Sequence, residues 1–276
     1  MRLPPSDQPV LFDRPALRLR RNRVRADALF LHDAALTEVQ DRLALVKRSF
    51  TQIAIVAPFP EKWQVAFPDA RIVRDADLLD LPVSAADLVI HAMCLHQAND
   101  PVGQIIQCRR ALQADGLFLC VSLGGETLHE LRTALAQAET VERGGLSPRV
   151  APMAEIRDLG ALLQRAGLAL PVADSFRLTA AYRDLNHLMR DLRAMGETNI
   201  LTARDRHLTR QGVFRRANSL YSEHFGQPDG RLPATFEMMC LTGWAPDDSQ
   251  PKPLRPGSAT ARLADALGTG ETKLPD

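Results

Sequence analysis

The stretches Ala86–Met93, ADLVIHAM, and Leu117–Leu123, LFLCVSL, are two nearly continuous apolar runs. A strand that is buried on both faces of a parallel sheet has this pattern. The segment between them, NDPVGQIIQCRRALQADG, predicts a helix with Asp100 as its N-cap, Pro101 in its first turn and Gly116 just past its end. A strand, a helix and a second buried strand in this order predict a parallel β-α-β unit.

Segments on both sides extend this unit. Gln52–Ala57 is a β-branched run stopped by Pro58 and Pro60, and ARIVRD is a short strand that ends at Asp75. Later in the chain, LALPVAD and ATFEMMCLTGWAP are expected strands, separated by helical patterns. We therefore expect an α/β fold with a mostly parallel sheet. The expected parts are a helical extension, an α/β core, a helical insertion that caps the cleft, a last core strand and a tail, at 1–50, 51–182, 183–232, 233–246 and 247–276.

Composition limits the class of protein. Hydrophobic residues make up 45% of the 276 and charged residues 24%, so a disordered or fibrous chain is excluded. The net charge of +1 gives no general attraction for nucleic acid. No apolar run reaches the roughly 20 residues of a membrane span. The start lacks the apolar core of a signal peptide, and Asp7 and Asp13 count against a transit peptide, so we expect a cytoplasmic protein.

The cysteines give no sign of a metal site. None of the four forms a CxxC pair, and three lie in apolar runs, where a thiol behaves as a small hydrophobe. We expect reduced thiols and no metal ligand set among Cys94, Cys108, Cys120 and Cys240.

Basic residues gather before the first strand. A helix is expected over PALRLRRNRVRADALF, and a second, amphipathic one follows behind an Asp33 cap. On the first helix Arg18, Arg21 and Arg25 recur at i, i+3 and i+7 and share a face. This face is either solvated or contacts an acidic protein partner.

Several motifs resemble a known family. The block DADLLDLPVSAADLVIHAMCLHQANDPVGQIIQCRRALQADGLFLCVSLGG resembles the second half of a class I S-adenosylmethionine-dependent methyltransferase. The segments LFDRPALRLRRNR, GGETLHELR and RAMGETN more narrowly resemble the mitochondrial complex I assembly factors of methyltransferase fold and their bacterial relatives. The malonyl-carrier-protein methyltransferases of biotin synthesis are similar but more distant. The resemblance covers nearly the whole chain and implies a Rossmann-like fold.

The expected cofactor loop departs from this resemblance. In the family the first strand runs into a glycine-rich loop, whose N–H groups approach S-adenosylmethionine. Here the loop contains Ala57, Pro58, Phe59 and Pro60, with no glycine and two residues that lack an N–H. The chain is also one strand-helix unit short before Arg71, which predicts a six-stranded sheet. Cofactor binding is therefore expected to be weak or absent.

The acidic residue Asp75 has two interpretations. By spacing it lies where a ribose-binding carboxylate belongs. By family motif it and Ala76 are the Asp-Ala pair that faces the adenine, and the better match of the residues after Asp75 favours this second interpretation. In either case the expected cofactor-binding residues are Ala57, Asp75, Ala76 and His91.

Candidate proton carriers flank the ends of the buried strands. His96 and Glu126 are the expected catalytic residues, with His129 beside Glu126 just beyond Gly124-Gly125. These glycines indicate either close approach to a ligand or a plain strand-to-helix turn. The insertion brings Arg190, Arg193 and Glu197 towards the cleft.

The resemblance leaves three functions open. The first is a methyltransferase-family protein whose activity is weak or lost through the degenerate cofactor loop. The second is a non-catalytic assembly or binding factor related to respiratory complex I. The third is a protein-arginine hydroxylase, which is what the complex I assembly factor is understood to be.

Overall fold

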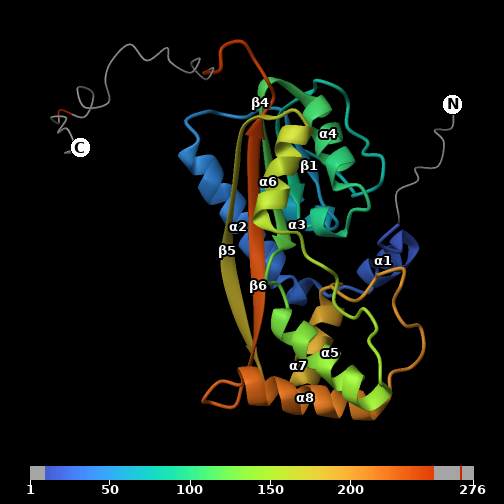
Figure 1. Ribbon diagram of the computed structural model, residues 1–276. Helices are drawn as coiled ribbons and strands as arrows, with labels where there is room; N and C mark the ends of the chain where they lie inside the picture. The colour runs from blue at the N-terminus through green and yellow to red at the C-terminus, as the bar shows by residue number, and fades with distance from the viewer. Residues whose placement is uncertain (1–9, 252–267, 269–276) are drawn as a thin grey trace, which may run out of the picture. The chain divides into compact units, whose positions relative to one another are not determined.

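A computed structural model describes residues 10–251 and 268 of the chain. Its sheet has six strands in the order β2-β1-β3-β4-β6-β5 (Figure 1). The pairs among β2, β1, β3 and β4 are parallel, and β6 runs antiparallel to both of its neighbours, β4 and β5. The sheet is mostly parallel and has no seventh strand among the described residues, which confirms the predicted α/β fold. The strands are β1 (Ile53–Val56), β2 (Arg71–Val73), β3 (Ala86–Ala92), β4 (Leu112–Gly124), β5 (Ala169–Tyr182) and β6 (Leu232–Trp244).

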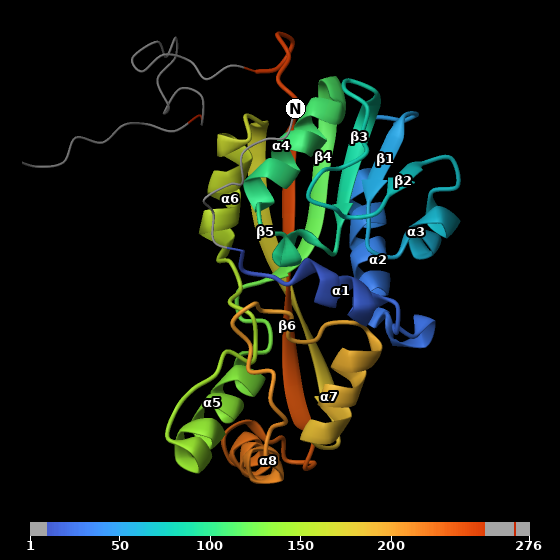
Figure 2. The ribbon, with the colours of Figure 1, turned by 90° about the vertical axis from the view of Figure 1, so that its right-hand side faces the viewer.

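Side chains alternate between the two faces of this sheet, because successive residues of a strand point in opposite directions. Leu88 and Ile90 of β3 belong to one apolar cluster, and Val89 between them belongs to another. The first cluster includes residues of α2 (Phe30–Leu45), and the second includes residues of α4 (Pro101–Ala111) and α6 (Ile156–Arg165) (Figure 2). The short helix α3 (Pro60–Ala66) connects β1 to β2.

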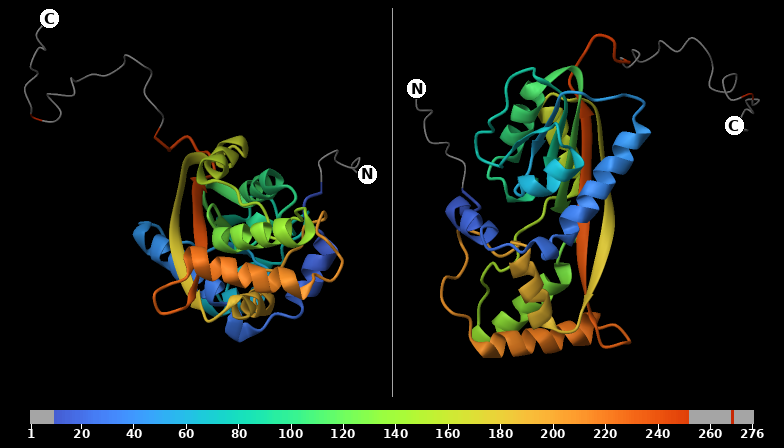
Figure 3. Two further views of the ribbon diagram at one scale, coloured as in Figure 1. Left: turned by 60° about the horizontal axis from the view of Figure 1, so that its bottom comes forward. Right: turned by 180° about the vertical axis from the view of Figure 1, so that it is seen from behind.

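The strands β5 and β6 continue past the ends of the parallel strands (Figures 1 and 3). Three helices pack around this extension: α5 (His129–Arg143), α7 (Leu185–Ala194) and α8 (Gln211–Phe225). The last two form the insertion between β5 and β6, which confirms the predicted helical insertion before the last strand.

Three predicted element boundaries were wrong. The helix α4 ends at Ala111 and β4 starts at once, so Gly116 lies within the strand, and the left-handed residue there is Asp115 with φ 57°. The helix α2 begins at Phe30, which places Asp33 inside its first turn rather than at its N-cap. The N-terminal helix α1 (Arg14–Arg21) ends well before Phe30.

The chain divides into two compact units, Met1–Pro246 and Asp247–Asp276. All six strands and all the helices described above belong to the first unit. In the described part of the second, Asp247 Oδ1 accepts a hydrogen bond from Ser249 N at 2.8 Å.

Candidate functional site

The helix α1 lies at the carboxyl ends of the parallel strands, where α/β proteins bind their ligands (Figure 2). Asp13 is its N-cap and accepts from Ala16 N at 2.9 Å. Just before it, Phe12 N donates to Asn99 Oδ1 at 2.8 Å, and Asp13 N donates to Ile200 O at 2.8 Å. The start of the chain is thus tied both to the loop after β3 and to the insertion.

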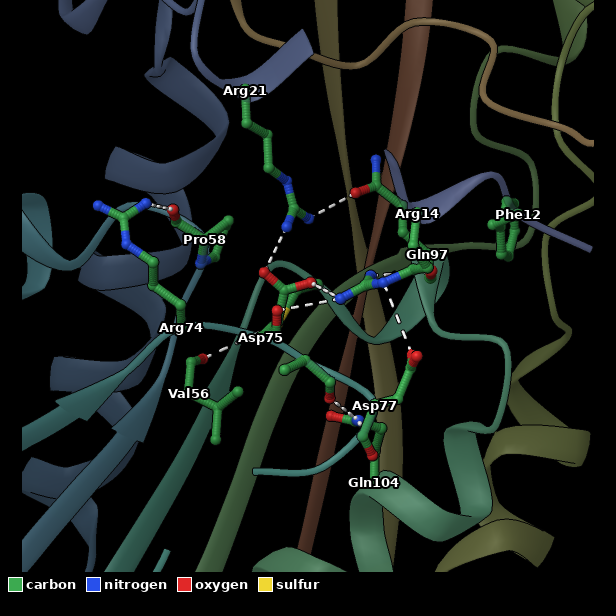
Figure 4. A network of polar contacts seen from close by, with 12 residues as sticks. Phe12, Arg14, Arg21, Val56, Pro58, Arg74, Asp75, Asp77, Gln97 and Gln104 are labelled. Carbon is green, nitrogen blue, oxygen red and sulfur yellow. Dashed lines mark hydrogen bonds and ion pairs between the residues drawn. The ribbon is translucent and has the colours of Figure 1, made fainter. Parts of the chain in front are cut away.

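Two arginines of α1 converge on Asp75, whose side chain is 6% exposed (Figure 4). Arg14 Nη2 donates to Asp75 Oδ2 at 2.9 Å and to its backbone oxygen at 3.0 Å. Arg21 Nη1 pairs with the other carboxylate oxygen, Oδ1, and Arg21 Nη2 donates to Gln97 Oε1 at 2.6 Å. Both oxygens of the expected cofactor carboxylate therefore already accept from the chain's own N-terminal helix.

The loop after β1 has few backbone N–H groups that are free to bind a cofactor. Ala57 N donates to Val73 O at 3.0 Å, so this N–H belongs to the pairing of β1 with β2. Pro58 and Pro60 have no N–H. A class I methyltransferase site needs free backbone donors here and a free acidic acceptor opposite them. Here Ala57 N and both carboxylate oxygens of Asp75 already have partners within the chain.

His91 and Ala76 lie near Asp75, and His91 is buried whereas Ala76 is exposed. The His91 ring is fully buried, with its Nε2 3.2 Å from Gln104 Oε1, and burial lowers its pKa to about 4. Gln104 Nε2 donates to Ala76 O at 2.5 Å. Gln104 therefore joins His91 to Ala76, and these contacts help to hold the loop that carries Asp75.

His96 is the centre of a second polar network. Its Nδ1 is 3.1 Å from Ser122 Oγ, and its Nε2 is 3.3 Å from Glu197 Oε2. Ser122 Oγ also accepts from His96 N at 3.0 Å. The hydroxyl hydrogen is then free to point at Nδ1, which leaves the ring proton on Nε2, towards Glu197. Burial opposes ionisation of Glu197, but the contact with His96 and the nearby charge of Arg21 lower the Glu197 pKa.

A cavity of about 280 Å³ begins beside His96 and Glu197. Apolar side chains of β4, β6, α5, α7 and α8 form most of its wall, among them Leu123, Leu131, Leu192, Phe214 and Phe236. Arg149, Arg193 and Thr198 also line it, and Phe12 and Ile200 contribute from the tied segments. Arg193 and Glu197, which the sequence predicts near the cleft, both line this cavity.

The other expected catalytic residue, Glu126, does not line this cavity and lies apart from His96. Its side chain is 52% exposed, with Oε2 3.8 Å from His129 Nδ1. The two preceding glycines make room for the protein's own side chains, because a Cβ on Gly125 would meet Glu237 Oε2 at 2.3 Å. The pair therefore forms a tight strand-to-helix turn rather than an approach to a ligand.

The structure also corrects the prediction that Arg18, Arg21 and Arg25 share one face of the first helix. Arg25 lies beyond the end of α1 and pairs with Asp27, and Arg21 points inward to Asp75. Of the three arginines, Arg18 alone is both helical and exposed. The arginine that completes the Asp75 contact is Arg14, which sequence reasoning missed although it is part of the quoted LFDRPALRLRRNR segment.

Metal and membrane features were searched over the same described residues. No cluster of three or more His, Cys, Asp or Glu side chains in 10–251 and 268 is arranged to hold a metal ion, and none of the helices there is long and apolar enough to cross a membrane. The four cysteines are free and buried.

Comparison with known proteins gives the relatives of the chain. It is 36% identical over 204 residues to arginine-hydroxylase NDUFAF5, mitochondrial, of Danio rerio, which covers 74% of this chain and 63% of the relative. It is 31% identical over 205 residues to malonyl-[acyl-carrier protein] O-methyltransferase of Gallionella capsiferriformans, covering 73% and 67%. The chain thus spans a little under two thirds of the NDUFAF5 relative.

The cytoplasmic location expected from the sequence is contradicted by the NDUFAF5 relatives, whose names place them in mitochondria. No protein-family profile matches the chain. Among solved structures, the YcgJ protein of Bacillus subtilis aligns with a TM-score of 0.48 at 13% identity, over 78% of this chain and all of the other. By its sequence relatives, the chain belongs to the class I methyltransferase-fold family that includes malonyl-[acyl-carrier protein] O-methyltransferase and arginine-hydroxylase NDUFAF5.

Proposed function

We propose that this chain is a binding factor of methyltransferase fold that holds a protein partner and transfers no methyl group. The observation that carries the proposal is the double contact of Arg14 and Arg21 with Asp75. The two guanidinium groups cover this carboxylate, whose side chain is only 6% exposed, so a ribose or an adenine would have to displace Arg14 or Arg21 to reach it. The glycine-free loop after β1 removes donors on the opposite side.

The partner surface in this proposal is the outer side of α1 and the turn after it. Arg18 and Arg23 are exposed there, and Arg20 is partly exposed. No acidic partner within the described residues pairs with these three guanidinium groups. Local positive charge of this kind favours an acidic protein surface and speeds its encounter. The relatives named NDUFAF5 point to a mitochondrial partner, and the family resemblance points to a subunit of respiratory complex I.

An incubation with complex I subunits and labelled S-adenosylmethionine tests the proposal. The expected result is co-elution of the chain with one subunit in gel filtration, no label on that subunit, and loss of co-elution in the triple variant Arg18→Glu, Arg20→Glu, Arg23→Glu. Transfer of label to any subunit overturns it. The triple charge reversal Arg157→Glu, Arg165→Glu, Arg215→Glu, on other helices, is the matched control.

Arginine hydroxylation is the second candidate, favoured by 36% identity to a relative named arginine-hydroxylase. Hydroxylation inserts one atom of O2 into a C–H bond and reduces the other to water, so the incubation is repeated in air with an added two-electron reductant, and mass spectrometry of the subunits distinguishes it. A gain of one oxygen atom on an arginine that depends on the chain makes hydroxylation the first choice, and unmodified arginines leave the binding factor in place.

A further inference from the structure

One oxygen of the Glu197 carboxylate is left without a partner by the residues that the structure describes. Glu197 follows α7 and lines the cavity beside His96 and Gln97. Its Oε2 accepts from Gln97 Nε2 at 2.7 Å and lies 3.3 Å from His96 Nε2, whereas no donor of the described residues reaches its Oε1. The side chain is 17% exposed, and Oε1 is not one of the buried polar atoms there that solvent cannot reach. A ligand in the cavity can therefore touch this oxygen.

The chemistry of this oxygen selects the group that meets it. The contact with His96 and the nearby charge of Arg21 lower the Glu197 pKa, so the carboxylate is ionised at neutral pH. An ionised carboxylate accepts hydrogen bonds and cannot donate one. A ligand that displaced its water without supplying a donor would leave a charged acceptor unsatisfied, which is costly. The ligand must therefore carry an N–H or O–H group.

The charge of Glu197 is already balanced, which disfavours an ionic ligand. Arg14 and Arg21 both contact Asp75, and Arg21 also acts on Glu197 through its charge. Two guanidinium groups therefore stand against two carboxylates. Asp77, which lies 3.7 Å from Arg14, is 78% exposed, so water and salt screen its charge. A further ion of either sign would bring an unbalanced charge into the cavity.

The rest of the wall sets the body of the ligand. Arg149 pairs with Glu139, and Arg193 is exposed, so neither adds an unpaired buried charge. The other lining residues are mostly apolar, and about 280 Å³ has room for on the order of ten non-hydrogen atoms, since a water molecule in the liquid takes about 30 Å³. We infer that this cavity binds a neutral, mostly apolar small molecule, which donates one N–H or O–H hydrogen bond to Glu197 Oε1. This inference does not rest on the proposed function, because the outer side of α1 takes no part in it.

Calorimetric titration of the full chain with four probes of similar size tests the polar group of the ligand. Indole has one N–H donor, benzothiophene has the same two-ring shape with sulfur in place of the N–H, benzamidine is a cation and phenylacetate an anion. Indole is expected to bind about tenfold more tightly than benzothiophene, since only indole satisfies the carboxylate, and more tightly than either ion. Equal affinity for indole and benzothiophene, tighter binding of benzamidine or phenylacetate, or no binding of indole overturns the inference.

The variant Glu197→Gln tests the placement, because it keeps the shape of the side chain and changes the free oxygen. The new amide oxygen is expected to take the place of Oε2, where Gln97 and His96 donate, and this turns the NH2 group towards the position of Oε1. A donor of the ligand then meets a donor of the protein. Indole affinity is therefore expected to fall at least tenfold, while benzothiophene affinity stays within about twofold.

Glu223→Gln is the matched control, since Glu223 is exposed on α8 and does not line the cavity, and indole affinity is expected to stay unchanged in it. Melting curves of the unliganded proteins check that both variants fold. Unchanged indole affinity in Glu197→Gln, or an equal loss for indole and benzothiophene, overturns the inference. If Glu197→Gln does not fold, the four probes on the parent protein decide by themselves.

Discussion

Arg21 in α1 forms an ion pair with Asp75 after β2, and the two side chains are only 11% and 6% exposed. They stand 54 residues apart in the chain, so the pair fastens the N-terminal helix across the sheet. The carboxylate that the family resemblance assigns to a cofactor is in this way part of the protein's own structure.

Replacing Asp75 by Asn should destabilise the protein by about 3 kcal/mol, because Arg14 and Arg21 would keep their buried charges and lose the carboxylate between them. Urea unfolding at pH 7 measures the change. The control is Asp80→Asn, whose carboxylate pairs with Arg71 but is 88% exposed, and which should change stability by less than about 0.5 kcal/mol. Equal effects of the two variants would show that the Asp75 contacts do not hold α1.

Charge reversal separates the two sides of α1. Arg21→Glu should lower the melting temperature, because it puts a second carboxylate against Asp75 and Glu197. Arg18→Glu should leave the melting temperature nearly unchanged, since Arg18 is exposed. Calorimetric scans of both variants make the comparison. Tolerance of Arg21→Glu together with unfolding of Arg18→Glu would mean that α1 is rotated relative to this description.

Glu139 should make stability depend on acid pH. Its side chain is 1% exposed, and although burial opposes ionisation, Arg149 and Ser147 lower its pKa to about 2. Its pKa in the folded state is below the unfolded value, so its contribution is complete above about pH 4.5 and is lost as pH falls towards 2.

Glu139→Gln should therefore remove roughly 3 kcal/mol at pH 7 and much less at pH 2.5. Denaturant unfolding of both proteins across this range tests it. The matched control is Glu223→Gln, an exposed carboxyl on α8. A constant difference between Glu139→Gln and the parent at all pH values would contradict the prediction.

His32 should give a second pH dependence, between about pH 6.5 and 4. The ring is 3% exposed and packs edge-on against Phe59, and burial lowers its pKa to about 4. A histidine that is neutral in the fold but protonated in the unfolded chain takes stability away as pH falls through this window. Because His32 Nδ1 has no hydrogen-bond partner among the described residues, His32→Phe should keep the fold and flatten this part of the curve. If the stability of His32→Phe fell with pH in the same way as that of the parent, the assignment of this pH dependence to His32 would be contradicted.

The local pattern of the sequence predicts most of the fold. Continuous apolar runs identify β3 and the end of β4, and the Asp100 cap identifies the start of α4, where Gly103 N donates to Asp100 Oδ1 at 2.8 Å. The length between Ala57 and Asp75 predicts the missing strand. The end of α4 was predicted wrongly because the Gly116 signal is local, whereas pairing of β4 with β3 begins at Leu112.

The site is less predictable, since its contacts join distant segments. His96 meets Ser122 and Glu197, which are 26 and 101 residues away, and no local pattern records such a distance. The inward direction of Arg21 was missed for the same reason, because helical spacing shows which residues share a face and not what that face meets. Asp75 was identified, but its partner Arg14 was not, because an arginine in a basic segment looks like part of a solvated surface.

Isothermal titration calorimetry with S-adenosylmethionine and S-adenosylhomocysteine tests most directly the claim that α1 and the degenerate loop have replaced the cofactor contacts. Each lost hydrogen bond to a charged group is worth roughly 1.5–3 kcal/mol, so two lost bonds weaken binding on the order of a hundredfold or more. The predicted result is binding no tighter than the high-micromolar range for either compound. A low-micromolar dissociation constant, or S-adenosylhomocysteine carried through purification in the cleft, would contradict the claim and make methyl transfer the first choice of function.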